Sequence, residues 1–184
     1  MQAPSFKRAP WFPAMLLLHA SVVCASPPHP VLQVSSSSFA DGGKIPSTFT
    51  CDGANLSPEI QFPSPPAGTK SFALVMDDPD APTAFTHWLA YGIPADTREL
   101  PEGASTPSKR LEHAVEGINS FGRTGYGGPC PPEGQAHHYV FRIYALDAMP
   151  SLPVGASTDQ VNAAIQGHIL AEGRMTGLYA RGGG

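Results

Sequence analysis

The sequence has little charge and only three cysteines, and it lacks a hydrophobic run long enough to cross a membrane. Only 14% of its 184 residues are charged, and the formal net charge is −4. A basic excess that would attract nucleic acid or an anionic bilayer is therefore missing. The low charge also argues against a helical bundle or coiled coil, which would be rich in Ala, Glu, Lys and Leu. The longest apolar stretch, residues 11–23, is shorter than the roughly 18 residues of a spanning helix.

Glycine and proline are abundant instead. The chain contains 19 Gly and 21 Pro, and 41% of its residues are hydrophobic. That apolar content is too high for a disordered chain, and the glycines lack the three-residue period of collagen. The length corresponds to one domain with a sizeable core. We therefore expect a single, loop-rich, mostly β domain.

The first 25 residues resemble an export signal. Lys7 and Arg8 precede the apolar stretch 11–23, and a small-residue cleavage site ends at Ala25. This pattern is typical of a secretory signal peptide. We expect a signal peptide at 1–25 and one exported domain at 26–184, periplasmic or secreted after cleavage near Ala25.

The cysteines fit this interpretation. A lipoprotein leader, acylated at Cys24, is an alternative that the bulky Val23 disfavours. Removal of the leader leaves Cys51 and Cys130 in a compartment that permits disulfides, so we predict a bridge between them. Two buried thiols are the alternative.

Five segments predict strands and one predicts a helix. Residues 71–76 and 87–93 are apolar runs of strand length, and 139–146 alternates between two faces. Residues 31–34 and 175–180 are expected to be the first and last strands. Ser157 and Gln160 form a capping box, after which apolar residues continue at helical spacing. We expect that helix to run until Gly173, with His168 on its apolar face as a core or rim histidine.

Three polar segments adjoin the ends of these strands. The Asp-Pro turn 77–82 follows one strand, His87 opens the next, and the glycine loop 125–132 precedes His137 at the start of the clearest strand. Each segment alone is most often structural. Together they indicate a small anion pocket, in which loop amides and imidazoles bind an oxyanion and a carboxylate orients an imidazole or accepts an ammonium group.

Four motifs resemble a known family. The segments MDDPDAP, HWLAYGIP, GINSFGRTGYGGPCPPEGQAHHYVFRIYALD and GHILAEGRMTGLY are similar to signature segments of the phosphatidylethanolamine-binding proteins, closest to the bacterial Raf kinase inhibitor-like branch. The resemblance covers residues 31–180. It implies an antiparallel β-sandwich with a few peripheral short helices and a pocket for phosphate or phosphorylated head groups.

The resemblance also implies particular site residues. Exported members of this branch that resemble the chain have cysteines in the TCDG and GPCPP segments, which supports the Cys51–Cys130 bridge. Asp80 and Pro82 would brace the acidic turn, and His138 would point to the opposite face of its strand. The residues implied to bind the ligand are Asp78, His87, Gly128, Pro132, His137 and Tyr139.

Three classes of function remain open. The first is an exported, non-enzymatic module that binds phosphate-containing small molecules or phospholipid head groups, with no cofactor or metal. The second is an inhibitor of a protease or kinase acting through the same surface. The third is an enzyme, for which the sequence offers no G-x-S-x-G or H-E-x-x-H motif. Asp78, His87 and His137 would be the ligands of a metal hydrolase.

Overall fold

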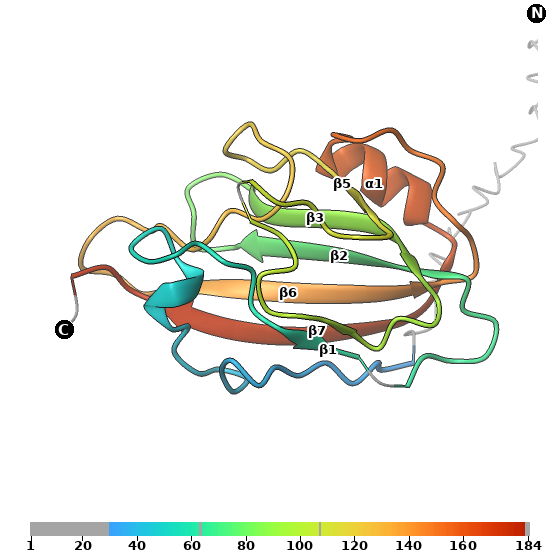
Figure 1. Ribbon diagram of the computed structural model, residues 1–184, viewed down its shortest axis with the longest axis horizontal. Helices are drawn as coiled ribbons and strands as arrows, with labels where there is room; N and C mark the ends of the chain where they lie inside the picture. Colours follow the sequence, from blue (N-terminus) through green and yellow to red (C-terminus); the bar gives the residue numbers. More distant parts are fainter. Residues whose placement is uncertain (1–29, 63, 107, 183–184) are drawn as a thin grey trace, which may run out of the picture.

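The computed structural model describes residues 30–62, 64–106 and 108–182, so the expected signal peptide at 1–25 lies outside the described residues. A five-stranded antiparallel sheet with the order β5-β3-β2-β6-β7 forms the centre of the molecule (Figure 1). A two-stranded sheet, β1-β4, contributes to the layer on one of its faces. The strands are β1 (Ile60–Gln61), β2 (Ser71–Asp78), β3 (Phe85–Pro94), β4 (Glu99–Leu100), β5 (Val115–Glu116), β6 (His137–Leu146) and β7 (Ile169–Tyr179).

Strand β2 lies in the middle of the large sheet and is buried on both faces. All its side chains from Ser71 to Met76 are buried, as the continuous apolar run predicts. Alternate residues enter two separate hydrophobic clusters, one shared with the β1-β4 layer and one shared with helix α1 (Thr158–Ile165). The prediction of a mostly β, sandwich-like fold is confirmed.

Helix α1 begins where the sequence predicts and ends earlier. The Ser157 and Gln160 side chains form the expected capping box. The helix stops at Ile165 because Gly167 has a φ of +82°, a left-handed conformation that ends a helix readily. The expectation of a helix reaching Gly173 is therefore wrong. His168 is also not a core or rim residue of that helix, since its ring is exposed and pairs with Asp147 at 2.8 Å.

Gly173 instead lies inside β7, where the N-terminal segment crosses it. A Cβ on this residue would lie 2.4 Å from the carbonyl oxygen of Leu32. The predicted strand at 31–34 is an extended segment with only isolated bridges, at Val31 and Ser35. It pairs once with β7 and once with β1, so it does not form a continuous ladder.

The disulfide between Cys51 and Cys130 is present, with a Cα–Cα distance of 5.4 Å. It joins the segment after the 3-10 helix η1 (Ser47–Phe49) to the loop before β6. No helix within the described ranges is long and apolar enough to cross a membrane.

The sheet brings four strand ends together. Strands β2 and β7 end, and β3 and β6 begin, at the same end of the molecule, on the left in Figure 1. Antiparallel pairing produces this arrangement because neighbouring strands run in opposite directions. The polar segments identified in the sequence are carried by these ends.

Candidate ligand-binding site

Asp78 and His137 form a buried pair between the ends of β2 and β6. The Asp78 side chain accepts hydrogen bonds through Oδ1 from the backbone N–H groups of Asp80 and Ala81, at 2.9 and 3.1 Å. Its Oδ2 lies 2.7 Å from Nδ1 of His137. Because a carboxylate oxygen only accepts, Nδ1 of His137 carries the hydrogen and Nε2 remains available to a ligand.

His87, on β3, is 2% exposed and likewise has its Nδ1 occupied. Its Nδ1 lies 2.7 Å from the carbonyl oxygen of Gly127 and therefore donates. Burial lowers the pKa of His87, while the Gly127 carbonyl and the Asp78 carboxylate act in the opposite direction. The neutral ring then presents Nε2 as an acceptor, suited to a protonated phosphate oxygen or an ammonium group.

Tyr139 lies two residues after His137 on the same face of β6 and packs edge-on against His87, with the ring centroids 5.1 Å apart. Its hydroxyl is buried without a hydrogen-bond partner, as is one other side-chain atom among the described residues, Oε1 of Glu59. Burial raises the pKa of Tyr139 well above its usual value, and the charges of Asp78 and Asp80 raise it further by smaller amounts. The hydroxyl therefore remains a donor, and a buried donor without an acceptor is costly.

A second acid–histidine pair ties the acidic turn to β6. His138 alternates to the opposite, exposed side of the strand, as expected, and both its backbone N–H and its Nδ1 lie 2.7 Å from Oδ2 of Asp80. The hydrogen bond from the His138 backbone is the main reason that the pKa of Asp80 is lowered. Asp80 thus lies where a brace was expected, and Pro82 is exposed in the same turn.

Two amides of the glycine loop already have hydrogen-bond partners inside the protein. The N–H of Gly127 donates to the carbonyl of His87 at 3.0 Å, and the N–H of Gly128 donates to Oδ1 of Asn55 at 2.7 Å. A Cβ on Gly128 would lie 2.4 Å from the carbonyl oxygen of Phe49, so this glycine permits close packing. Pro132 is exposed. The Gly127 and Gly128 amides are thus engaged within the protein, and a role of Gly128 in the wall of the ligand site stays a prediction.

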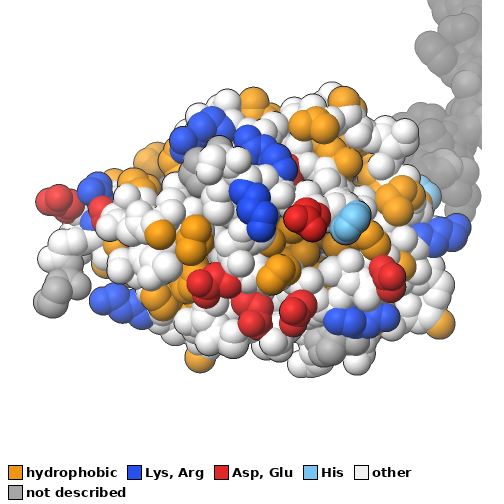
Figure 2. Space-filling view, viewed as in Figure 1, with side chains coloured by type: hydrophobic (Ala, Val, Ile, Leu, Met, Phe, Trp, Pro, Cys, Tyr) orange, Lys and Arg blue, Asp and Glu red, His pale blue; other side chains and the backbone are white. Residues whose placement is uncertain are grey.

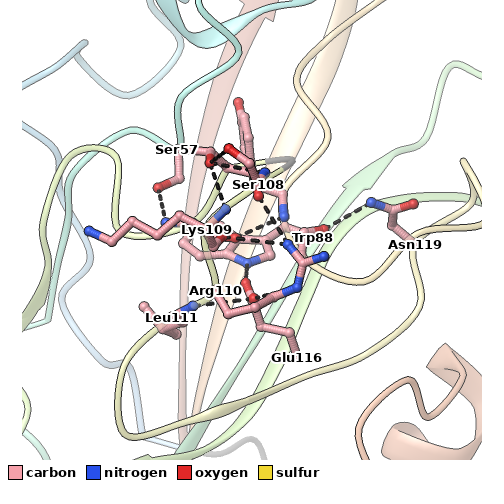
Figure 3. Close-up of polar contacts among 12 residues, drawn as sticks. Ser57, Trp88, Ser108, Lys109, Arg110, Leu111, Glu116 and Asn119 are labelled. Atoms are coloured by element: carbon pink, nitrogen blue, oxygen red, sulfur yellow. Dashed lines mark hydrogen bonds and ion pairs between the residues drawn. The ribbon is translucent and has the colours of Figure 1, made fainter.

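A buried acid that the sequence analysis missed, Glu116, lies between Trp88 and the segment around Leu111 (Figure 3). Glu116 accepts through Oε1 from the indole N–H of Trp88 at 2.8 Å and through Oε2 from the N–H of Leu111 at 3.2 Å. The guanidinium of Arg110 lies 4.0 Å away and is half-exposed. Nδ2 of Asn119 donates to the carbonyl of Gly125 at 2.9 Å, which closes the loop on itself.

Two phenylalanines near His87 were also missed. The rings of Phe85 and Phe121 lie 5.0 and 5.3 Å from the His87 ring and 4.9 Å from each other. The sequence signal for Phe121 was its place in the GINSFG segment. A cleft of about 620 Å³ reaches Asp78 and Phe85 at its edge. Most of its lining, including Asp77, Arg142 and Thr158, lies toward α1, and His87, His137 and Tyr139 do not line it.

Basic side chains lie close to the same loop. Arg110 approaches Gly125, where a Cβ would be 2.9 Å from its Nη1, and Arg123 lies over the ring of Phe121 at 5.7 Å. Figure 2 shows Lys and Arg side chains grouped on the upper part of the viewed face and Asp and Glu below them. Within the described part of the chain, no group of three or more His, Cys, Asp or Glu is arranged to hold a metal ion.

A sequence model of the phosphatidylethanolamine-binding proteins matches residues 35–180. The chain belongs to the phosphatidylethanolamine-binding protein family. Its relatives include proteins named UPF0098, one from Aquifex aeolicus with 48% identity over 82% of this chain and 90% of the relative. Another, from Methanothermobacter thermautotrophicus, is 44% identical over 82% of this chain and the whole of the relative. The resemblance seen in the sequence is thus confirmed.

Solved structures of the family agree with this fold. A phosphatidylethanolamine-binding protein homologue from Chlamydia trachomatis has a TM-score of 0.75 and 34% identity, covering 82% of this chain and 98% of the other. YbcL from E. coli, described as a member of the mammalian family, has the same score and identity over 81% and 98%. A family member from Plasmodium vivax, with a TM-score of 0.54, 16% identity and coverage of 87% and 91%, shares the fold.

Family membership supports a binding protein, and the geometry adds which of the implied residues come together. Asp78, His87, His137 and Tyr139 form one buried group. Gly128 packs against Phe49 and Thr50.

Proposed function

We propose that this chain is an exported, non-enzymatic protein that binds phosphate-containing small molecules or phospholipid head groups at the group formed by Asp78, His87, His137 and Tyr139. The observation that carries the proposal is the Tyr139 hydroxyl, which is buried without a partner beside His87. A phosphate oxygen would satisfy this donor. Membership of the family supports the same class of ligand.

The polarities of the side chains suit a phosphate monoester. The Tyr139 hydroxyl donates, and Nε2 of the neutral His87 accepts the hydrogen of a protonated phosphate oxygen. The Asp78 carboxylate, already paired with His137, supplies negative charge for an ammonium group carried on the same ligand. Phosphorylethanolamine has both groups and is the natural first probe.

Export is supported by the leader-like residues at the start of the sequence and by the Cys51–Cys130 bond, since disulfides persist in oxidising compartments. The full chain expressed in a bacterium should appear in the periplasmic or extracellular fraction, with an intact mass that indicates cleavage near Ala25. Uncleaved protein retained in the cytoplasm would contradict export and leave the binding proposal unchanged.

Binding is tested by titration calorimetry of the purified, oxidised protein with phosphorylethanolamine and inorganic phosphate. Tyr139→Phe removes the hydroxyl and should weaken binding about tenfold, the value of one lost hydrogen bond to a charged group. Tyr144→Phe is the matched control, because Tyr144 lies on the other face of the same strand. Absence of heat with every phosphorylated ligand would retire the proposal, and release of inorganic phosphate from an ester would contradict its non-enzymatic part.

A further inference from the structure

Phe121 covers the proposed binding group. Its ring meets the His87 ring edge-on at 5.3 Å and the Phe85 ring at 4.9 Å. A Cβ on Gly127 would lie 2.6 Å from Cδ2 of Phe121, so the ring rests directly on this glycine. Phe121 is 38% exposed whereas His87 is 2% exposed. One side of the phenyl ring therefore contacts the buried imidazole while another part meets water.

The backbone beneath this ring is fixed, which leaves the side chain as the part that moves. Oδ1 of Asn119 accepts the N–H groups of Phe121 and Arg123 at 3.0 and 3.2 Å. The N–H of Gly122 donates to the Asn119 carbonyl at 2.9 Å. The phenyl ring packs against Phe85, His87 and Gly127 and lies beneath the Arg123 guanidinium. A change of its side-chain rotamer uncovers His87 without breaking a backbone hydrogen bond.

We propose that Phe121 determines which phosphate compounds the site accepts, an inference that rests on the proposed function. A ligand reaches His87 only when the ring is displaced, and displacement gives up the contacts with Phe85 and His87. Inorganic phosphate offers nothing apolar in return. A phosphate ester with an apolar or aryl group packs against the displaced ring and against Phe85.

The size of this selectivity follows from aromatic contacts. Each such pair contributes roughly a twofold to tenfold change in an equilibrium constant. When inorganic phosphate binds, the Phe121 ring loses its contacts with Phe85 and His87. When an apolar ester binds, contacts with the ester replace them. The ligand class is therefore phosphate esters that carry an apolar group next to the phosphate. An aryl phosphate carries the apolar group directly on a phosphate oxygen, and a phospholipid carries its acyl chains on the glycerol that esterifies the phosphate.

The covering role is tested without any ligand. Diethyl pyrocarbonate modifies accessible neutral imidazoles, and peptide mass spectrometry reports the rate at each histidine. In the unaltered protein His87 should react slowly, while the exposed His113 and His168 react fast and serve as internal standards. Phe121→Ser should increase the rate of modification at His87 about tenfold. The rates at His113 and His168 should not change. Phe121→Tyr, which keeps a ring, should restore protection.

Val154→Ser is the matched control, since Val154 is an exposed apolar residue on another loop. It should leave the His87 rate unchanged. Thermal unfolding of each variant verifies that the fold is retained. Fast modification of His87 in the unaltered protein, or no change in Phe121→Ser, would overturn the covering role.

Selectivity is tested by calorimetry with phenyl phosphate, dihexanoyl phosphatidylethanolamine below its micellar concentration, and inorganic phosphate. The unaltered protein should prefer at least one of the esters by about tenfold or more over inorganic phosphate. Phe121→Ser should reduce that ratio. Preference for phenyl phosphate alone identifies an aryl ligand, and preference for the lipid alone identifies a head group with acyl chains.

The two proposals fail in different ways. If phosphate compounds bind and Phe121→Ser leaves the ratio between esters and inorganic phosphate unchanged, the selectivity role is wrong and the proposed function stands. If no phosphate compound binds even the unaltered protein, the proposed function and the selectivity role both fail. The diethyl pyrocarbonate rates then still decide whether Phe121 covers His87.

Discussion

The carboxylate of Asp78 and the imidazole of His137 are 2.7 Å apart although 59 residues separate them in the sequence. One residue ends β2 and the other begins β6, and these strands are direct neighbours in the sheet. The pair therefore depends on the long-range pairing of the two strands. A second, exposed aspartate–histidine pair, Asp80 and His138, lies beside it in the same turn and strand.

Replacement of Asp78 tests whether this pair orients His137. Asp78→Asn keeps an oxygen for the Asp80 and Ala81 amides and removes the negative charge beside His137. Because the residue is buried, we expect the free energy of unfolding to fall by about 1–3 kcal/mol. We also expect weaker binding of phosphorylethanolamine. Urea unfolding and calorimetry measure the two effects.

Asp80→Asn is the control for that substitution, since Asp80 is exposed and its pairing with His138 is worth little in water. Its unfolding transition should shift much less than that of Asp78→Asn. Equal shifts in the two variants would mean that burial of the Asp78–His137 pair has no special effect on stability.

The pKa of His87 predicts how stability depends on pH. Burial lowers this pKa in the folded protein from the ordinary value of 6.5, so the unfolded chain binds a proton that the folded chain does not. The contribution of His87 to the free energy of unfolding is therefore fully present above pH 6.5 and decreases as pH falls through 6.5 toward the folded value. Asp80 adds a separate loss as pH falls through 3.8 and below.

Urea unfolding between about pH 7.5 and pH 5 checks this, with His87→Gln as the comparison because glutamine does not titrate. The unaltered protein should lose more stability over this range than the variant does. His168→Gln, a change at an exposed histidine, should behave like the unaltered protein. Parallel pH curves for the unaltered protein and His87→Gln would show that His87 is not the responsible group.

The core strands could be predicted from local patterns in the sequence. That the distant polar segments meet could be predicted because each adjoins the end of one of these strands. The run 71–76 and the alternation in 139–146 directly report burial on two faces. The Asp-Pro turn and His137 were expected to meet because each adjoins the end of a core strand. The family resemblance added Tyr139, whose orphaned hydroxyl only the folded structure reveals.

Other features depended on tertiary contacts that no local pattern reports. Gly173 resembled a helix stop, but it lies in β7. A glycine is needed there because the segment around Leu32 crosses the strand too closely for a side chain. Gly128 resembled part of an anion cradle, yet its amide is used by Asn55, 73 residues away. The covering ring of Phe121 likewise depends on where its loop folds back onto Gly127.

Glu116 is expected to stabilise the loop that presents the Gly127 carbonyl to His87. Glu116→Gln keeps an oxygen acceptor for the Trp88 indole. Its new NH2 group then faces the N–H of Leu111 and the guanidinium of Arg110, and a donor placed against donors forms no hydrogen bond. We expect the free energy of unfolding to fall by about 1–3 kcal/mol. Arg110→Gln should cost much less, because Arg110 is half-exposed. A larger loss for Arg110→Gln than for Glu116→Gln would reverse this assignment.

The Cys51–Cys130 bond is expected to stabilise the fold and the site together. It closes a span of 79 residues, for which the entropic model gives an upper value of roughly 4–5 kcal/mol. In the double variant Cys51→Ser with Cys130→Ser, the free energy of unfolding should fall by a substantial part of that amount. Urea unfolding measures the change. The bond also joins the segment that packs on Gly128 to the loop bearing Gly127, whose carbonyl orients His87.

Loss of the bond should therefore weaken ligand binding even where the protein remains folded. Calorimetry with phosphorylethanolamine, at a temperature well below unfolding, separates this effect from global stability. Reduction of the unaltered protein should reproduce the result of the double variant, because both remove the same link. If stability falls and affinity is unchanged in both, the loop keeps the Gly127 carbonyl in place through the Asn55 and Asn119 contacts alone.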